Sequence, residues 1–264
     1  MSGPPRLLSL PLLSLPLLSL RGIGKSYGAV TAVRAVDLDV FPGEVLAICG
    51  DNGAGKSSLI KIMAGAQPPS TGSIHLRGVQ TRFRSPHDAL AQGVATIYQD
   101  LALAPRLSIA ANVFMGAELT RPFVLPFLRI LDKARMAEQA RAYLARLSVH
   151  IDDMRRPVEG LSGGQRQAVA ISRALRWDAG IIIMDEPTAA LGVRETAQVL
   201  DLVRHLKSEG RTVILISHNM ADVAALATRV AIMKSGAKVI DRPIDGLGPD
   251  DLGQMVMTGR DKAA

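Results

Sequence analysis

Short, unbroken apolar runs recur along the chain and predict buried strands. Such runs cover Val45–Cys49, residues 181–184 and Thr212–Ile216. Runs of this length suit strands that are covered on both faces, as in a parallel sheet. Residues 36–41 instead alternate apolar and polar side chains, which predicts a strand that is buried on one face only.

Between these runs, apolar residues recur with the spacing of a helix. One helical face collects Met136, Ala140, Tyr143, Leu144 and Leu147, and a second collects Val199, Leu200, Val203 and Leu206. Strands that alternate with amphipathic helices predict an α/β fold with a mainly parallel sheet.

The stretch from residue 100 to 158 interrupts this alternation. It has no strong strand pattern, it is helical in character, and it contains a proline-rich passage at 122–126. We therefore expect a helical subdomain inserted into the α/β core. Further along, residues 230–233 and 238–240 predict a closing hairpin. After Pro243 we expect a turn and a short helix, with Asp250 or Asp251 near its start.

The N-terminus repeats one short sequence. Residues 7–20 contain Leu-Leu-Ser-Leu-Pro twice and then Leu-Leu-Ser-Leu. A signal peptide is the alternative, but Pro11 and Pro16 interrupt the apolar stretch, Arg6 is the one basic residue before it, and no clear cleavage site follows. We expect the last copy, 17–20, to lead into the first strand, and residues 1–17 to be a disordered extension.

Composition narrows the class of protein. The chain has 264 residues, enough for one large domain or two small ones. Its one cysteine, Cys49, excludes an intrachain disulfide, fits a reducing compartment and is expected in the core. The net charge of +7 permits contact with nucleic acid, anionic lipid or phosphate ligands and selects none of them. No unbroken apolar stretch reaches about 18 residues, so we expect no membrane span.

A glycine-rich sequence between a strand and a helix carries the first chemical motif. It matches the phosphate-binding loop Gly-x-x-x-x-Gly-Lys-Ser. Glycines let backbone N–H groups turn toward phosphate oxygens, and the following helix adds the positive end of its dipole. Lys56 is expected to reach the β- and γ-phosphates and Ser57 to bind Mg²⁺. An ordinary glycine-rich turn is the alternative. The predicted nucleotide-binding residues are Gly50, Asp51, Asn52, Gly53, Ala54, Gly55, Lys56, Ser57 and Ser58.

Two carboxylates follow the apolar run 181–184. They are Asp185 and Glu186, and α/β folds bind ligands at the C-terminal ends of strands. Asp185 is expected to hold Mg²⁺ directly or through water, and Glu186 to orient and polarise the attacking water. Surface carboxylates are common, so the prediction depends on the phosphate loop elsewhere in the chain.

A third motif, Leu161-Ser162-Gly163-Gly164-Gln165, precedes a helical pattern. A linker with Ser162 as helix N-cap is the simpler interpretation, and it explains Ser162 but not the whole pentapeptide. Together with the two earlier motifs, it makes the chain resemble the ABC ATPases, in which Leu-Ser-Gly-Gly-Gln is the signature. The resemblance implies that Ser162, Gly163, Gly164 and Gln165 cap the γ-phosphate bound to a second subunit, so that hydrolysis needs a dimer.

Other positions match the same family one by one. Gln99 resembles the glutamine that senses Mg²⁺ and the γ-phosphate and faces the transport partner. His218, at a strand end, resembles the histidine that contacts the γ-phosphate. Tyr27 resembles the aromatic residue that stacks on adenine, although a single tyrosine is more often a packing residue. Taken alone, Gln99 and His218 would be an ordinary loop residue and a structural histidine.

The resemblance covers residues 18–258 and implies the architecture. We expect a P-loop NTPase core with a mainly parallel sheet, an antiparallel β portion and an inserted helical signature subdomain. The corresponding boundaries are a single ATPase domain at 18–246, with the helical part at about 100–158 and extending to 177, and a tail at 247–264. One departure concerns Gly192, where the family usually has an aspartate that shapes the dimer interface and couples the two sites.

The likeness extends to the ATPases of bacterial monosaccharide importers of the fructose and ribose type. It is carried by Phe83-Arg84-Ser85-Pro86, residues 96–103, residues 112–116 and residues 216–220. It implies an ATP- and Mg²⁺-dependent ATPase at the cytoplasmic face of the membrane. The implied partners are a second ATPase subunit, a membrane permease and, indirectly, an extracytoplasmic sugar-binding protein.

Two alternatives remain at this point. An ABC ATPase could act on nucleic acid or the ribosome, but the chain has neither a long coiled-coil insertion nor a second ATPase domain, and we expect no nucleic acid. A regulatory subunit that binds ATP with weak turnover is suggested by Gly192. The presence of Lys56, Asp185, Glu186 and His218 argues against it.

Overall fold

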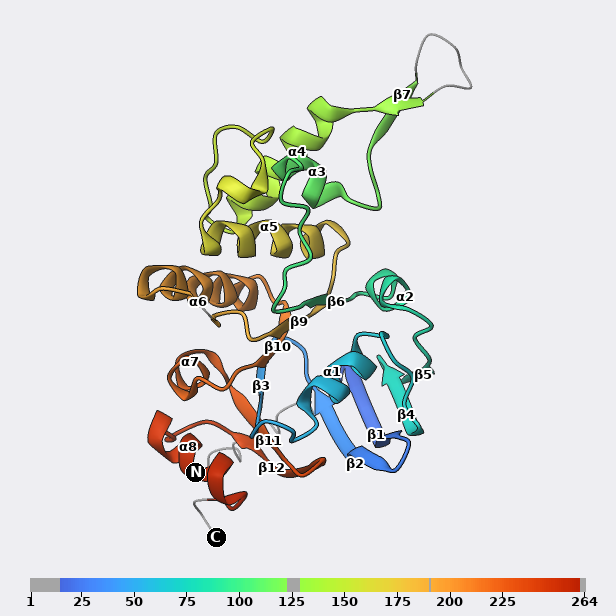
Figure 1. Ribbon diagram of the computed structural model, residues 1–264, viewed down its shortest axis with the longest axis vertical. Coiled ribbons are helices and arrows are strands. Elements are labelled where there is room, and N and C mark those ends of the chain that lie inside the picture. Colours follow the sequence, from blue (N-terminus) through green and yellow to red (C-terminus); the bar gives the residue numbers. More distant parts are fainter. Residues whose placement is uncertain (1–14, 123–128, 190, 262–264) are drawn as a thin grey trace, which may run out of the picture.

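A central sheet organises the molecule. The computed structural model describes residues 15–122, 129–189 and 191–261. Six strands lie in the order β12-β11-β3-β10-β9-β6, all parallel to their neighbours except β12 (Figure 1). They span Val45–Cys49 (β3), Val94–Ile97 (β6), Ile181–Asp185 (β9), Thr212–Ile216 (β10), Arg229–Lys234 (β11) and Ala237–Pro243 (β12). The predicted buried strands and closing hairpin are confirmed.

The unbroken apolar runs reflect burial on both faces of this sheet. In β3, Leu46 and Ile48 pack into one core with helix α1 (Lys56–Met63), whereas Val45, Ala47 and Cys49 pack into a second core. Successive side chains of a strand point to opposite faces, so both sets must be apolar. The second core is built with α5 (Gly163–Arg176), α6 (Val193–Ser208) and α7 (Met220–Leu226).

A separate antiparallel sheet covers the first core. Its order is β2-β1-β4-β5, formed by Val30–Val40 (β2), Leu18–Tyr27 (β1), Thr71–Leu76 (β4) and Val79–Thr81 (β5). The Leu17 N–H donates to the Val40 carbonyl at 2.8 Å, so the last repeat copy leads into the fold as expected. The extension predicted for 1–17 lies almost wholly outside the described residues. Strand β2 begins earlier than the alternating segment 36–41, because its first residues pair with the end of β1.

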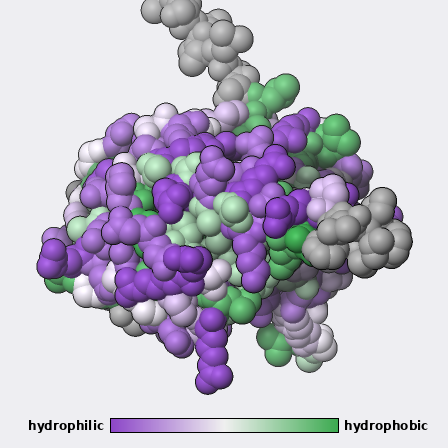
Figure 2. Space-filling view, turned by 90° about the horizontal axis from the view of Figure 1, so that it is seen from above, coloured by the Kyte–Doolittle hydropathy of each residue, from purple (hydrophilic) through white to green (hydrophobic). Residues whose placement is uncertain are grey.

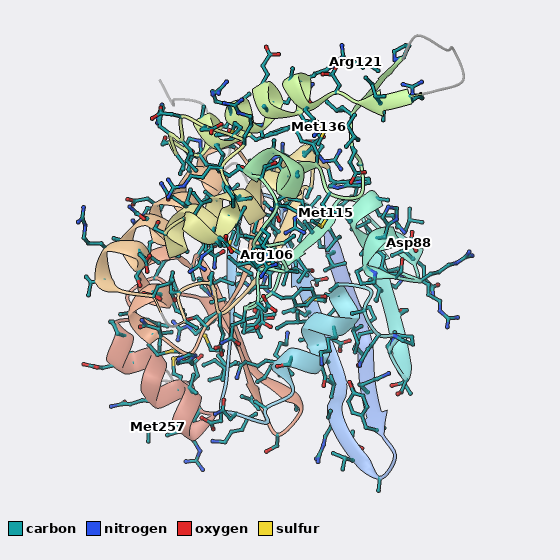
Figure 3. The ribbon with its side chains drawn as sticks, turned by 45° about the horizontal axis from the view of Figure 1, so that its top comes forward. Asp88, Arg106, Met115, Arg121, Met136 and Met257 are labelled. Carbon is teal, nitrogen blue, oxygen red and sulfur yellow. The ribbon has the colours of Figure 1, made fainter. Side chains whose placement is uncertain are left out.

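Helices dominate the middle of the chain. Helices α3 (Ile109–Phe114) and α4 (Lys133–Arg146) pack on each other and on α5, above the central sheet in Figure 1. Figure 3 places Met136 and Arg121 in this upper part and Met257, on α8 (Pro249–Thr258), at the opposite end. Two strands were not predicted here: Thr120–Pro122 (β7) pairs with Arg129–Leu131 (β8). Both are short and mainly exposed, so they carry no apolar pattern. Of the proline-rich passage 122–126, Pro122 is described and the rest lies outside the described residues.

The remaining elements complete the two cores. Helix α2 (Pro86–Ala91) precedes β6, and a short 3-10 turn, Val158–Gly160, precedes α5. Helix α8 confirms the helix expected after Pro243, and it buries Leu252 and Met255 in the second core. The surface in Figure 2 is mostly hydrophilic with scattered apolar residues. None of the described helices combines the length and apolar character that crossing a membrane requires.

A buried asparagine fixes the loop that precedes α3. The Asn112 side chain is fully buried, accepts from the Ala104 N–H at 2.8 Å, and donates to the carbonyls of Ala104, Leu107 and Ser108 at 3.1 to 3.3 Å. A side chain satisfied in this way replaces regular secondary structure for that loop.

We expect Asn112→Leu, which is close to isosteric, to lower the free energy of unfolding by about 1–3 kcal/mol, because it leaves buried loop groups without partners. Chemical denaturation with an unchanged m-value would measure this. Glu138→Gln, at an exposed position of α4, is the matched control. Equal stability of Asn112→Leu and wild type would contradict the role given to this side chain.

Cys49 is confirmed as a core residue. It is fully buried, and burial raises the pKa of its thiol to about 12. Since the thiolate is the reactive form, we expect Cys49 to resist a thiol reagent in the folded protein and to react with one equivalent after denaturation. Rapid labelling under native conditions would show that the strand before the phosphate loop opens readily.

Candidate functional site

Four neighbouring strands end at one edge of the central sheet. In the sheet order β3-β10-β9-β6, the segment after β3 holds the phosphate loop, that after β10 holds His218, and that after β6 holds Gln99; Asp185 and Glu186 lie at the end of β9. Parallel strands bring their C-terminal ends together, so residues far apart in sequence share this edge. The residues predicted to bind or hydrolyse the nucleotide therefore lie at this edge of the sheet, except Tyr27 and residues 162–165.

The phosphate loop has a backbone that its glycines make possible. Gly50, Gly53 and Gly55 have φ angles of 150°, 80° and 98°. A Cβ atom added at Gly50 would clash with the Met233 carbonyl, and one at Gly55 with the Ala32 carbonyl. These are positions where L side chains are both strained and obstructed. The loop is therefore held in shape by β11 and β2.

Lys56 is tied to this loop. Lys56 is the first residue of α1 and is 9% exposed. Its ammonium donates to the carbonyl of Gly50 at 2.5 Å and to that of Asp51 at 3.0 Å. Buried lysines need partners, and here the partners are weak neutral acceptors. An anion such as a phosphate would offset the charge better. Helix α1 begins at Lys56 with Gly55 as its N-cap, so Lys56 and Ser57 both lie in its first turn.

Glu186 combines an unusual backbone with a charged neighbour. Its φ of 50° lies in the left-handed region, while its N–H donates to the Ile216 carbonyl at 2.9 Å and so continues the ladder with β10. Its carboxylate lies 3.2 Å from Nδ1 of His218, whose side chain is 67% exposed. Strained backbone conformations cluster at functional sites. The pair fits a base that is oriented by a histidine.

Asp185 is half-buried beside Glu186. Burial raises the pKa of the Asp185 carboxyl, the Glu186 carboxylate raises it further, and Lys56 and Lys61 oppose the rise. Negative charge is therefore concentrated at this edge, which a divalent cation would relieve. Mg²⁺ prefers oxygen ligands and is usually held by one or two carboxylates together with phosphate. The oxygens of Ser57, Asp185 and Gln99 fit that preference, and the described residues hold no His, Cys, Asp and Glu cluster of the kind that binds a metal unaided.

Gln99 lies in a cavity next to Glu186. The cavity has a volume of about 390 Å³ and is lined by Gln99 and Asp100, by Glu186 and Pro187, and by Gly163 and Gln167 of α5. Gln99 itself is exposed. The segment after β6 and the start of α5 therefore meet beside the carboxylate.

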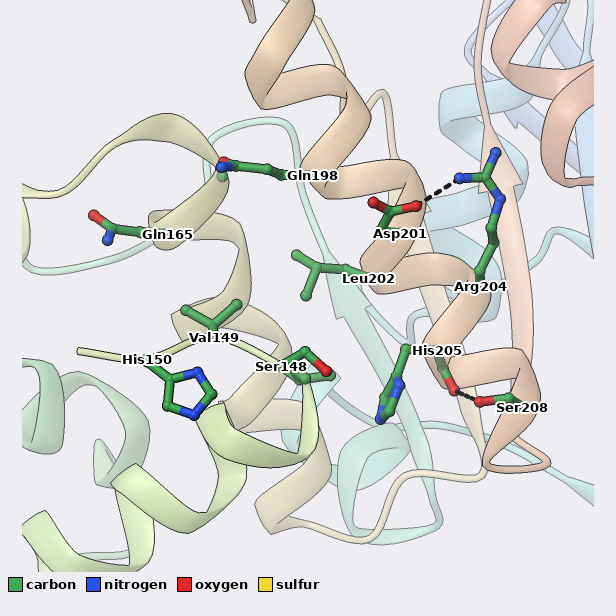
Figure 4. Close-up of a pocket in the computed structure, with 12 residues that line it drawn as sticks. Ser148, Val149, His150, Gln165, Gln198, Asp201, Leu202, Arg204, His205 and Ser208 are labelled. Carbon is green, nitrogen blue, oxygen red and sulfur yellow. Dashed lines mark hydrogen bonds and ion pairs between the residues drawn. The ribbon is translucent and has the colours of Figure 1, made fainter.

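Residues 162–165 begin α5. Ser162 is the N-cap, as predicted: its hydroxyl accepts from the Gln165 N–H at 3.3 Å, and the Gln165 side chain accepts from the Ser162 N–H at 3.1 Å. Gly164 and Gln165 line a cavity of about 730 Å³ beside α6 (Figure 4). Within the described part of the chain, no hydrogen bond joins 162–165 to the phosphate loop.

Tyr27 ends β1. Its hydroxyl donates to the Gln67 side chain, its ring is 5.4 Å from the Lys25 ammonium, and it remains 43% exposed. The hairpin it closes continues into β2, whose Ala32 carbonyl borders Gly55. An exposed aromatic ring near the loop could take a base on its face.

Sequence reasoning missed three contacts around Glu186. The Thr188 hydroxyl donates to Asp222 at 2.6 Å, the Gln167 amide donates to the Pro187 carbonyl at 2.8 Å, and the Gly163 N–H donates to Glu195 at 2.7 Å. Gln167 could have been noticed as a polar residue on an otherwise apolar helical stripe with Ala168, Ile171 and Ala174. Glu195 and Asp222 carry no such pattern.

Comparison with known proteins agrees with this geometry. The family described as ABC transporter matches residues 33–189. The chain is 48% identical over 221 residues to a fructose import ATP-binding protein of Rhizobium meliloti, covering 83% of this chain and 85% of that protein. It is 46% identical over 242 residues to a ribose import ATP-binding protein of Streptomyces avermitilis, covering 92% of this chain and 46% of that protein. The chain thus spans about half the length of the ribose relative.

A solved structure gives the same result for the fold. A nucleotide-free ATP-binding cassette from an ABC transporter matches with a TM-score of 0.73 and 25% identity, covering 87% of this chain and 92% of that one. This likeness, with the two sheets described above, confirms the predicted fold class. The chain therefore belongs to the ABC transporter family, as one of its ATP-binding domains.

Proposed function

We propose that this chain is the ATP-hydrolysing subunit of an importer for a monosaccharide. The observation that carries the ATPase part is the placement of Lys56, Asp185 and Glu186, with His218, on the ends of adjacent parallel strands. The sugar is inferred from the import functions named for the fructose and ribose relatives. These relatives favour a transport subunit over a factor that acts on nucleic acid.

The site residues divide the work of phosphoryl transfer. The loop 50–58 binds the phosphates through backbone N–H groups, and the Lys56 ammonium neutralises charge on the β- and γ-oxygens. Glu186 accepts a proton from the attacking water, while His218 holds the carboxylate and contacts the γ-phosphate. Mg²⁺, when bound by Ser57, Asp185 and Gln99, would offset negative charge on the same oxygens.

The assembly follows from what one protomer leaves incomplete. Residues 162–165 form the start of a helix, and among the described residues no hydrogen bond joins them to the phosphate loop of their own protomer. In a dimer, residues 162–165 of one copy would contact the γ-phosphate that is bound to the other copy. The cavity beside Gln99 would face a membrane permease, so the subunit would lie at the cytoplasmic face of the membrane. Sugar specificity would then belong to the permease and to an extracytoplasmic binding protein.

We expect Glu186→Gln to lower the rate of ATP hydrolysis by at least about 100-fold, because a general base contributes that much or more. ATP binding and ATP-dependent dimer formation should persist, since the phosphate loop is unchanged. Phosphate release with Mg²⁺ and size-exclusion chromatography with ATP measure the two effects. Normal turnover by Glu186→Gln would remove Glu186 from the role of base.

Lys56→Ala tests the binding half of the proposal. We expect its affinity for ATP to fall by roughly tenfold or more, because a charge-assisted contact to phosphate is lost. Fluorescence titration with a labelled ATP analogue is the measurement, and Lys207→Ala, at an exposed position of α6, is the control. Unchanged affinity in Lys56→Ala would mean that the nucleotide binds elsewhere.

A further inference from the structure

The start of α5 is joined to the segment that follows Glu186 by a buried side chain. Gln167 is 5% exposed, and its Nε2 donates to the Pro187 carbonyl at 2.8 Å. A glutamine on the apolar stripe of α5 costs desolvation, and its Oε1 has no hydrogen-bond partner in the described structure. The amide orientation is fixed, since the opposite one would set two oxygens against each other. A costly polar residue at this place indicates a role beyond packing.

A second contact joins the same two parts of the chain. The Gly163 N–H donates to Glu195 Oε1 at 2.7 Å, so a carboxylate of α6 accepts from the first turn of α5. The other oxygen of Glu195 lies 3.5 Å from the Gly192 N–H at the start of its own helix. One carboxylate therefore faces the N-terminal ends of two helices, where negative charge is favourable.

The two glycines of the signature allow this close approach. A Cβ atom added at Gly163 would lie 2.5 Å from Leu191 Cδ2, and one at Gly164 would lie 2.5 Å from Gln198 Oε1. Figure 4 shows Gln198 of α6 reaching toward the loop where α5 begins. The N-terminal ends of α5 and α6 are thus packed as one body.

We propose that Gln167 and Glu195 are positioning residues that clamp the signature turn, 162–165, and the helix it begins to residues 186–187 and to the start of α6. The proposal rests on the proposed function, in which 162–165 of one protomer bind the nucleotide of another. When that nucleotide engages the signature turn, the clamp transmits the engagement to the backbone that carries Glu186. Occupancy of one site thereby sets the position of the base in the other.

Gly192 makes such a clamp useful in this chain. Its φ is −72°, and a Cβ atom there would meet nothing within 4 Å, so the backbone does not require glycine. The position therefore lacks a carboxylate by sequence rather than by steric need. Glu195, one helical turn further on, is the acidic residue that links α6 to the signature turn in this protein.

The test compares Glu195→Gln, which keeps an acceptor for the Gly163 N–H, with Glu195→Leu, which removes it. We expect Glu195→Leu and Gln167→Leu to lower kcat about tenfold, the scale of one lost buried hydrogen bond. The KM for ATP should stay within about twofold, because the phosphate loop is intact. Glu195→Gln should keep kcat within about twofold of wild type, because it retains an acceptor for the Gly163 N–H. Asp201→Leu, which breaks the exposed Asp201–Arg204 pair of α6, should change neither.

A second readout does not depend on turnover. In a Glu186→Gln background, ATP should slow amide exchange both in 162–165 and in 186–195, and adding Glu195→Leu should abolish only the second effect. Normal kcat in Glu195→Leu, an equal loss in Glu195→Gln, or retained ATP-dependent protection of 186–195 would overturn the clamp. Failure of the wild type to bind or hydrolyse ATP would instead overturn the proposed function. If the wild type binds ATP without turnover, the exchange comparison still tests the clamp separately from the proposed function.

Discussion

The parallel register of β3, β10, β9 and β6 is the constraint on which the site depends. It places the phosphate loop, His218 and the Asp185–Glu186 pair on adjacent strand ends, although some 160 residues separate the first from the last. Parallel pairing requires a crossover between strands. The helices α5, α6 and α7 bury one face of the sheet, and α1 with the antiparallel sheet buries the other. The two apolar cores, and hence the unbroken runs of Ile, Val and Leu, are consequences of that arrangement.

The edge gathers charge that the fold alone does not satisfy. Lys56 is held by neutral carbonyls, and the carboxyl of Asp185 has a raised pKa because it is buried next to Glu186. Glu186 itself is held in a left-handed backbone conformation. Each of these features costs free energy, and a nucleotide with its cation would offset the electrostatic part. These features therefore lower the stability of the fold at the place where ligand binding would raise it.

Sequence patterns predicted the strands and the placement of the candidate site residues at strand ends, but not the contacts that join them. Val45–Cys49 and Thr212–Ile216 are unbroken apolar runs, so burial alone identifies them. The spacing of the glycines and Lys56 predicts the phosphate loop, because this spacing between a strand and a helix is typical of phosphate binding. The hairpin of β7 and β8 was missed, since three-residue exposed strands leave no pattern. The bonds from Gln167 to Pro187 and from Gly163 to Glu195 depend on how α5 and α6 pack, which no local pattern encodes.

The central claim is that each catalytic site is built from two protomers, with the phosphate loop from one and the signature turn from the other. Mixing two inactive variants tests it directly: Lys56→Ala disables one half and Ser162→Arg the other. We expect either variant alone to be inactive and their mixture to recover part of the ATP hydrolysis, because one of the two sites in a mixed dimer contains both intact halves. A mixture that exchanges subunits yet stays inactive, beside an active wild type, would contradict the account.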